Sequence, residues 1–392
     1  MEPKIRFKGF EGEWKETTLS EICIVNPKAE LPHSFEYVDL ESVLGTNLIS
    51  HRTEYKETSP SRAQRVAEIG DIFFQSVRPY QRNNYLFTKS DANYVFSSGY
   101  VQLRTFEDNG FIFAIIQTDS FVDEVLCKCT GSSYPAISSK DLSHIPFRIT
   151  KSKSEQQAIA AYFRTLDNKI QSTSKKLASL KKLKSASLVS MFPQNGESMP
   201  KVRFKGFEGE WDKQSASDLF LTIDERNRPE LPVLSACQDV RGMIPRDKIG
   251  FNVSHDTSNE VTYKRVQPGQ FVIHLRSFQG GFAHSSYDGI ISPAYTVFDF
   301  KNKEQHDDYY WKIVFMSRSF IERLRLITYG IRDGRSISFN EFKELSFLFP
   351  SKEEQQAIAS FFRSLDRKIA LETARLEKLK QIKLACLDKM FV

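Results

Sequence analysis

The sequence predicts a duplicated fold of the mixed α/β (α+β) class, in which two globular domains are joined by two long α-helices with approximate two-fold symmetry. Three observations support this prediction. The phrase Arg-Phe-Lys-Gly-Phe-Glu-Gly-Glu-Trp at residues 6–14 returns at residues 203–211. The phrase Glu-Gln-Gln-Ala-Ile-Ala at residues 155–160 returns at residues 354–359. Each copy of the second phrase opens a long segment without glycine or proline, so one unit of roughly 195 residues is written twice.

Composition and charge restrict the classes of protein to which the chain can belong. Forty per cent of its 392 residues are apolar, which supplies packed interiors and excludes a disordered chain. The formal net charge of +6 permits a nucleic-acid partner. Because no apolar run could span a membrane and no signal peptide is recognisable, we expect a cytoplasmic protein with no membrane partner. The five cysteines form neither a disulfide framework nor a zinc motif.

The two segments without glycine or proline, 155–192 and 354–392, are each expected to form one helix of ~55 Å. Capping boxes at residues 152–155 and 351–354 mark their starts, with the serine hydroxyl and the glutamate carboxylate each satisfying a backbone N–H. The apolar residues follow the 4,3 spacing of a coiled-coil seam. The seam residues, which we also expect to serve partner docking, are Ile159, Phe163, Leu166, Ile170, Leu177, Leu180, Ile358, Phe362, Leu365, Ile369, Leu376 and Leu379.

Polar residues interrupt the seam at equivalent places in the two helices. Thr173 and Glu372 form the first pair of interruptions, and Lys184 and Lys383 form the second pair. We therefore expect the seam to shift in its last part, and the residues expected to continue it are Leu183, Leu188, Ile382 and Leu387.

Connectivity predicts that the two helices pair in antiparallel fashion. If the segment between them is compact and has neighbouring ends, the second helix starts where the first one stops and runs back. By the same reasoning, the N-terminal phrase should lie near the end of the second helix. The expected parts are a globular domain at 1–151, a helix at 152–196, a second domain at 197–350 and a second helix at 351–392.

The loops of the globular segments carry the chemistry that the sequence offers. No phosphate-binding or dinucleotide-binding glycine motif is present, and we expect no catalytic residue and no metal ligand. Arginine, glutamine and asparagine, which make bidentate contacts with guanine and adenine edges, gather in several loops. The candidate DNA-binding residues are Arg78, Tyr80, Gln81, Arg82, Asn83, Asn84, Ser133 and Tyr134 in the first half, and Arg276, Ser277, Gln279, Arg332 and Arg335 in the second half.

Residues 38–43, the pair Arg62-Ala63 before residues 70–72, and the closing runs at 142–147 and 345–350 stand in a characteristic order. Over essentially the whole chain this order resembles the specificity subunit of type I restriction–modification enzymes. The resemblance implies two target recognition domains, each reading one half of an asymmetric bipartite DNA site. It also implies that the helices space the domains and dock methylation subunits. The second half departs from the pattern, with Tyr263-Lys264-Arg265-Val266 in place of the Arg-Ala pair.

The same resemblance implies the partners of the chain and no catalytic activity of its own. The implied partners are double-stranded DNA, two copies of the methylation (modification) subunit and two copies of the restriction (motor and nuclease) subunit. No cofactor is expected in this subunit, because S-adenosylmethionine, ATP and magnesium would bind the partner subunits. Those partners would carry the DNA adenine methyltransferase and ATP-dependent deoxyribonuclease activities.

Two alternative functions follow from other readings of the same residues. One is a coiled-coil adaptor that binds only proteins, against which the arginine, glutamine and asparagine loops argue. The other is a duplicated nuclease with an unfamiliar site, against which we note that no titratable cluster recurs in both halves.

Overall fold

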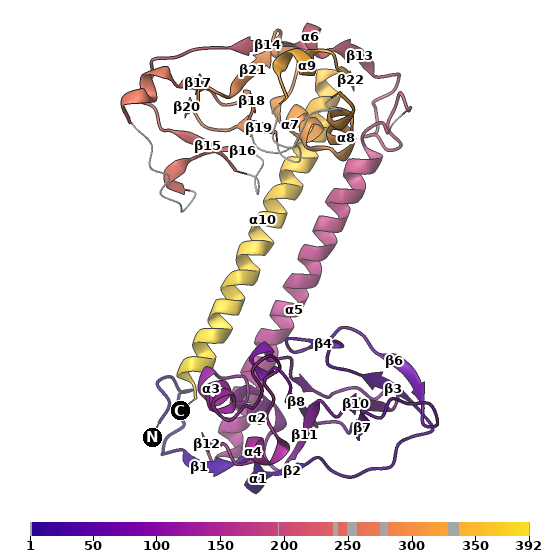
Figure 1. Ribbon diagram of the computed structural model, residues 1–392, viewed down its shortest axis with the longest axis vertical. Helices are drawn as coiled ribbons and strands as arrows, with labels where there is room; N and C mark the ends of the chain where they lie inside the picture. Colours follow the sequence, from indigo (N-terminus) through magenta and orange to yellow (C-terminus); the bar gives the residue numbers. More distant parts are fainter. Residues whose placement is uncertain are drawn as a thin grey trace. The chain divides into compact units, whose positions relative to one another are not determined.

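A computed structural model describes residues 2–194, 196–237, 242–248, 257–274, 281–327 and 337–391 (Figure 1). The chain divides into two compact units, of which unit 1 comprises Met1–Lys176 and Glu372–Val392 and unit 2 comprises Leu177–Leu371. Each unit contains one globular α/β domain and parts of the two long helices. These helices, α5 (Lys153–Ser190) and α10 (Lys352–Lys389), are both 38 residues long and begin directly after the serines of the predicted capping boxes, Ser152 and Ser351.

Unit 1 contains two four-stranded sheets and two strand pairs. The first sheet has the order β2-β11-β8-β9 and the second has the order β6-β3-β10-β7. The strands of the two sheets are β2 (Cys23–Val25), β11 (Tyr100–Thr105), β8 (Ile72–Gln75), β9 (Tyr85–Leu86), β6 (Arg52–Tyr55), β3 (Ser34–Val38), β10 (Tyr94–Ser97) and β7 (Ala63–Val66). The pairs are β1 (Lys15–Thr18) with β12 (Pro146–Ile149) and β4 (Val43–Leu44) with β5 (Asn47–Leu48), and the short helices are α1 (Leu19–Ile22), η1 (Pro79–Gln81), α2 (Asn109–Ile115), α3 (Asp119–Cys127) and α4 (Ser139–Ser143).

Unit 2 repeats part of this topology within its described residues. Its main sheet has the order β14-β21-β18-β19-β16-β15, whose first four strands follow the order of β2-β11-β8-β9. These strands are β14 (Phe220–Ile223), β21 (Thr296–Phe300), β18 (Phe271–Ile273), β19 (Phe282–Ser285), β16 (Gly242–Pro245) and β15 (Leu234–Cys237). The strand pairs are β13 (Asp212–Ser215) with β22 (Ser346–Phe349) and β17 (Lys264–Val266) with β20 (Gly289–Ile291). The short helices are α6 (Ala216–Leu219), η2 (Arg246–Lys248), η3 (Thr257–Thr262), η4 (Lys303–Gln305), α7 (Asp308–Met316), α8 (Arg318–Ile327) and α9 (Phe339–Lys343).

The two repeated phrases bind one another in each unit. In unit 1 the guanidinium of Arg6 donates two hydrogen bonds to the buried carboxylate of Glu155, at 2.7 and 2.9 Å. In unit 2 Arg203 contacts Glu354 in the same way, at 2.8 and 2.6 Å. Each arginine also donates to two backbone carbonyl oxygens within its own phrase. This interlock explains why both phrases occur together in each copy.

The capping boxes form only in part, and the arginines are the reason. The N–H of Glu155 donates to the hydroxyl of Ser152 at 3.3 Å, and the N–H of Glu354 donates to Ser351 at 3.4 Å. We predict that the two glutamate carboxylates return to the backbone, and this part of the prediction is wrong. Each carboxylate instead accepts the bidentate contact from Arg6 or Arg203. A charge-assisted pair of this geometry is stronger than a single bond to a neutral N–H.

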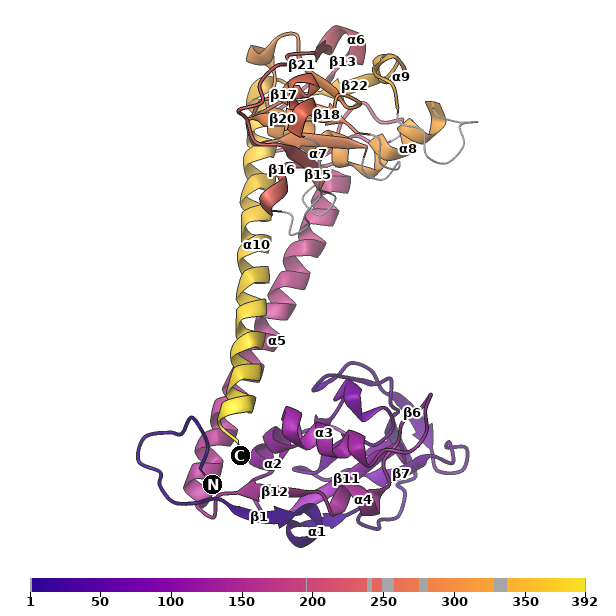
Figure 2. The same ribbon diagram turned by 60° about the vertical axis from the view of Figure 1, so that its left-hand side comes forward.

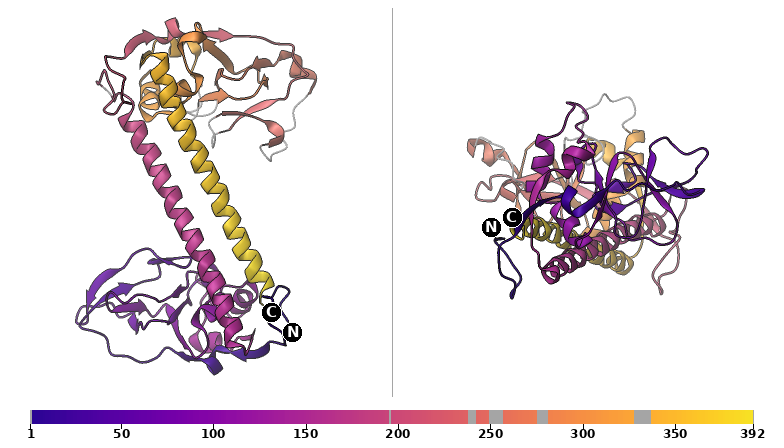
Figure 3. Two further views of the ribbon diagram at one scale, coloured as in Figure 1. Left: turned by 180° about the vertical axis from the view of Figure 1, so that it is seen from behind. Right: turned by 90° about the horizontal axis from the view of Figure 1, so that it is seen from below.

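The N-terminal strip of unit 1, residues 2–14, lies against the end of α10, as the sequence predicts (Figures 2 and 3). The N–H of Ile5 donates to the carbonyl oxygen of Lys389 at 2.9 Å. In unit 2 the N–H of Val202 donates to the carbonyl oxygen of Ser190, which ends α5, at the same distance. The end of α10 therefore plays the same part in unit 1 as the end of α5 does in unit 2.

Each unit has its own aromatic core at this junction. In unit 1 the buried ring of Trp14 packs on Phe111 and Phe391, with ring centroids 5.6 and 5.9 Å apart. In unit 2 the equivalent Trp211 packs on Tyr310 and Phe192, both at 6.3 Å.

Among the described residues, no helix is long and apolar enough to cross a membrane.

Candidate nucleic-acid interface

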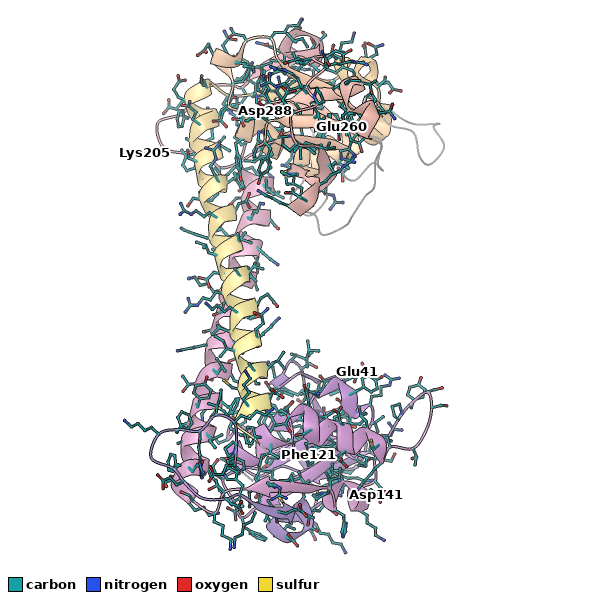
Figure 4. All side chains as sticks on the ribbon, turned by 90° about the vertical axis from the view of Figure 1, so that its left-hand side faces the viewer. Glu41, Phe121, Asp141, Lys205, Glu260 and Asp288 are labelled. Carbon is teal, nitrogen blue, oxygen red and sulfur yellow. The ribbon has the colours of Figure 1, made fainter. Side chains whose placement is uncertain are left out.

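A groove of about 750 Å³ on the surface of unit 1 contains four of the eight predicted residues of the first half, Arg78, Gln81, Asn83 and Tyr134. Its lining comes from the end of β8 and the loop that follows, from the segment after β3, from β4, from the turn between β10 and β11, and from the loop that carries Tyr134. The lining residues are Leu40, Glu41, Val43, Leu44, Arg62, Gln75, Val77, Arg78, Gln81, Asn83, Ser98, Gly99 and Tyr134. Figure 4 labels Glu41 at one edge of unit 1 and Asp141 at another.

Arg78 lines this groove and has an unusual backbone conformation. Its φ and ψ are both 55°, in the left-handed region, and it directly precedes Pro79. A non-glycine residue in this region costs of order 1–3 kcal/mol, and such strain persists only where the surrounding structure holds it. The N–H of Arg78 donates to the carbonyl oxygen of Pro135 at 2.7 Å, and its carbonyl oxygen accepts from the N–H of Gln81. Strain of this kind often marks a functional site.

The guanidinium of Arg78 lies over the ring of Tyr134, with its central carbon 4.3 Å from the ring centroid. Tyr134 itself is 63% exposed, so the pair faces solvent rather than the core. Stacking fixes the plane of the guanidinium while its N–H groups stay available. Arg78 makes no ion pair with any described residue. The pair therefore presents an oriented, uncompensated cation on the groove wall.

Three other residues of the predicted loop are engaged inside unit 1. Arg82 forms an ion pair with Asp119 at 2.6 Å and donates to the carbonyl oxygen of Gln117. Asn84 is buried, and its side-chain oxygen accepts the N–H of Gln75 at 2.8 Å. Asn83 accepts the N–H of Gly45, which ties the loop to the turn between β4 and β5. These contacts shape the loop and leave the guanidinium of Arg82 occupied, whereas Asn84 is withdrawn from the surface by its burial and its Nδ2 has no partner among the described residues.

The remaining predicted residues of the first half are exposed at the surface. Tyr80, Gln81 and Ser133 are exposed, and the side-chain oxygen of Gln81 accepts from the amide of Gln75 at 2.9 Å. The groove also contains Arg62, which the sequence singled out only through the family resemblance. Arg62 is exposed, and its side chain makes no hydrogen bond or ion pair with the described residues. Its nearness to Arg78 depends on the approach of the chain before β7 to the end of β8, which local sequence does not encode.

The candidates of the second half cannot be placed in the same way. Arg276, Ser277, Gln279, Arg332 and Arg335 all lie outside the described residues. In the described part of unit 2, Arg265 is compensated by Asp288 at 2.7 Å and by Glu225 at 2.9 Å. Asp288 and Glu225 raise the pKa of Arg265 through these hydrogen bonds. The segment that replaces the Arg-Ala pair is thus held by carboxylates.

The seam residues of the long helices are buried or half-buried along both helices. The buried ones are Ile159, Phe163, Leu166, Leu177, Ile358, Phe362, Leu365 and Leu376, and the half-buried ones are Ile170, Leu180, Ile369 and Leu379. In unit 1 the ring of Phe163 contacts Phe391 at 5.8 Å, so the start of α5 meets the end of α10. In unit 2 Phe362 contacts Phe192 at 6.1 Å, so the start of α10 meets the chain directly after α5.

The expected shift of the seam is correct for two of its four residues, since Leu387 is buried and Leu188 is half-buried. Leu183 and Ile382, which were to continue it, are 49% and 38% exposed, whereas Lys184 and Lys383 are half-buried at the next 4,3 positions. Each lysine reaches an aspartate of the other helix within its own unit, Lys383 to Asp167 and Lys184 to Asp366, both at 2.5 Å. The ion pairs let a charged residue occupy a seam position between the apolar residues on either side.

Comparison with known proteins gives a family match and a structural likeness. The sequence matches the type I restriction modification DNA specificity domain twice, over residues 11–182 and 210–381. No curated protein sequence matches it significantly. A crystal structure of the type I restriction-modification system S subunit from M. genitalium is similar over 100% of this chain and 99% of its own, with a TM-score of 0.66 and 15% identity. A chain solved in a study of complex assembly and conformational transition of a type I R-M system is similar over 96% of this chain and 97% of its own, with a TM-score of 0.50 and 18% identity.

Proposed function

The chain belongs to the family of type I restriction modification DNA specificity domains and contains two of them, and we propose that each globular domain reads one half of an asymmetric bipartite DNA site. DNA sequence specificity is the function of the chain. The assignment of one half-site to each domain rests on the duplication, because the two copies share their helix junctions and differ in their loops.

The groove of unit 1 supports the proposal most directly. It combines two arginines without carboxylate partners among the described residues, an exposed tyrosine and an exposed glutamine. Arginine reads guanine in the major groove by a bidentate contact, and a stacked guanidinium is already oriented for such a contact. We assign base readout to Arg78 and Gln81, phosphate or base contact to Arg62, and a structural role to Arg82 and Asn84.

We further propose that α5 and α10 form an antiparallel coiled coil that spaces the two domains and docks two methylation subunits. The contacts of opposite helix ends within each unit, the buried seam residues and the ion pairs between the helices support this arrangement. The chain would carry no catalytic site and no cofactor. S-adenosylmethionine, ATP and magnesium would bind the methylation subunits and the two restriction subunits of the complex.

The decisive experiment is methylation-site sequencing of the complex reconstituted with an Arg78→Ala variant. Loss of a bidentate contact costs about 1–3 kcal/mol and relaxes one base position. We expect that relaxation in one half-site only, with the other half-site and the spacing unchanged.

Arg148→Ala is the matched control, because Arg148 is a part-exposed arginine of the same unit on β12, outside the groove, and pairs with Glu16. It should leave both half-sites unchanged. A variant Arg78→Ala complex that keeps full specificity would exclude readout by this residue. Equal relaxation of both half-sites would contradict the division of labour between the domains.

A further inference from the structure

The two units differ at one position of their helix junctions. A displacement of 199 positions relates Glu155 to Glu354, and the same displacement relates Gly110 on α2 to Tyr309 on α7. The surroundings confirm the equivalence of these positions. Asp108 and Asp307 cap the two helices, and their N–H groups donate to Gln156 and Gln355, both at 3.1 Å. Unit 2 therefore has a phenol ring where unit 1 has no side chain.

In unit 2 the ring of Tyr309 is held by three side chains. Its hydroxyl donates to Oδ2 of Asp366 at 2.8 Å. The guanidinium of Arg363 lies 4.6 Å from the ring centroid, and the ammonium of Lys312 lies 5.2 Å from it. Burial, together with Asp366, raises the pKa of Tyr309, so the hydroxyl keeps its proton and remains a donor. Unit 2 thus shows a complete binding site for a hydroxylated aromatic ring, filled by its own chain.

In unit 1 the equivalent place is a cavity of about 250 Å³. Cavities of about 150 Å³ are already large enough to bind benzene. The lining includes Arg164 and Asp167, the counterparts of Arg363 and Asp366, together with the apolar side chains of Phe113, Phe163 and Leu387. A Cβ atom on Gly110 would lie 2.9 Å from the Cβ of Ala160, so α2 packs too closely on α5 for a residue at this position to fill the cavity.

The polar groups around this cavity are incompletely satisfied. Gln117 is 94% buried, since only 6% of it is exposed, and its side-chain Nε2 has no hydrogen-bond partner among the described residues. Arg164 makes no hydrogen bond or ion pair with them either. Asp167 uses Oδ1 for Lys383 and has no bond of this kind at Oδ2 within the described chain. A buried donor without a partner is costly and calls for an occupant that accepts from it.

We propose that the cavity between α2, α5 and α10 of unit 1 is a binding site for the tyrosine side chain of a partner protein. The ring would take the place that Tyr309 takes in unit 2, stacked on Arg164. Its hydroxyl would donate to Asp167 and accept from Nε2 of Gln117.

A protein is favoured over a free phenol because the cavity continues into a second groove. That groove, of about 350 Å³, shares Gln117, Asp167, Lys383 and Leu387 with the cavity and also contains the exposed Leu384. A peptide segment could place a tyrosine in the cavity while an adjoining residue covers Leu384. Since Tyr309 closes the equivalent place in unit 2, the two units would offer non-equivalent docking sites. That the partner is the methylation subunit rests on the proposed function.

The first test uses the full chain alone, with p-cresol as the analogue of a tyrosine side chain and toluene as the analogue without the hydroxyl. Titration followed by NMR, together with crystals soaked in p-cresol, should place the ring in the cavity of unit 1. Because the hydroxyl bonds to a carboxylate, p-cresol should bind about tenfold more tightly than toluene. Equal affinities, or binding only elsewhere on the chain, would overturn the proposal.

Two variants separate the cavity from its counterpart. Arg164→Ala, an exposed residue whose loss should leave the fold intact, should weaken p-cresol about two- to fivefold. The matched change Arg363→Ala in unit 2 should leave p-cresol affinity unchanged, because Tyr309 already occupies that site. Equal effects of the two variants would refute the assignment to unit 1.

The second test uses the chain assembled with the methylation subunit. The cavity should then exclude p-cresol, and a structure of the complex should show a tyrosine ring against Arg164. An open cavity, retained p-cresol binding or an occupant other than tyrosine would overturn the partner assignment. If no methylation subunit binds the chain at all, the proposed function fails, while the measurements on the chain alone still decide whether the cavity accepts a phenol.

Discussion

Removing the guanidinium of Arg6 should destabilise unit 1 and leave unit 2 unaffected. The carboxylate of Glu155 is only 1% exposed and depends on Arg6 for two charge-assisted hydrogen bonds. Truncating one partner of a buried ion pair leaves an uncompensated charge and costs about 3–5 kcal/mol. For a folding unit of about 200 residues, each 1 kcal/mol lowers Tm by about 2–4 °C. The Arg6→Ala substitution should therefore lower the Tm of unit 1 by about 6–20 °C.

The assay is thermal unfolding combined with hydrogen exchange resolved by peptide. Faster exchange should appear in the first turns of α5 and in the N-terminal strip. Arg203→Ala should produce the same change in unit 2, at the start of α10, because Arg203 binds Glu354 with the same geometry.

Arg148→Ala provides the surface reference. Its ion pair with Glu16, at 3.4 Å on a part-exposed edge, should contribute no more than about 1 kcal/mol. The reasoning would be refuted if Arg6→Ala cost no more than Arg148→Ala, or if it loosened both units equally.

Three further predictions concern the helices and the core of unit 2. Asp167→Lys should lower the stability of unit 1 in denaturant unfolding, because it places a second cation against Lys383. Asp167→Lys combined with Lys383→Asp should recover most of the loss. A double variant no more stable than the single one would show that the pair does not act at the seam. Removing one heptad from each helix, around Leu177 and Leu376, shortens each helix by ~10 Å. The complex should then fail to assemble, or methylation-site sequencing should show unchanged half-sites at a new spacing. Active enzyme with the old spacing would contradict the role of the helices. Burial lowers the pKa of His306 to about 4 from its ordinary value near 6.5, so the folded state binds its proton less readily than the unfolded state. Unit 2 should therefore lose stability as pH falls from about 6.5 towards 4. His306→Phe should reduce the loss of Tm across that range, and an unchanged pH profile would refute the role of His306.

The division of roles within the loop after β8 needed the tertiary structure. Arginine, glutamine and asparagine side chains made residues 78–84 a candidate interface, and the groove contains several of them. Composition could not tell Arg78, which stacks on Tyr134, from Arg82, which pairs with Asp119, because both partners come from other parts of the chain. Arg62 belongs to the groove because the fold brings the chain before β7 to the end of β8, which composition does not show either.

The sequence by itself determined the duplication, the two long helices and the contact of the N-terminal strip with the end of α10. The first two features follow from patterns along the chain, namely the repeated phrases, the absence of glycine and proline, and the 4,3 spacing. The third follows from connectivity, because a compact domain with neighbouring ends returns the chain to its start. Only the tertiary structure decided the positions and the partners of the charged side chains. Lys184 and Lys383 stay in the seam because aspartates of the facing helix reach them, and Glu155 and Glu354 leave their caps because Arg6 and Arg203 bind them. A charged side chain takes its position from its partner, and partners distant in sequence are brought together only by the fold.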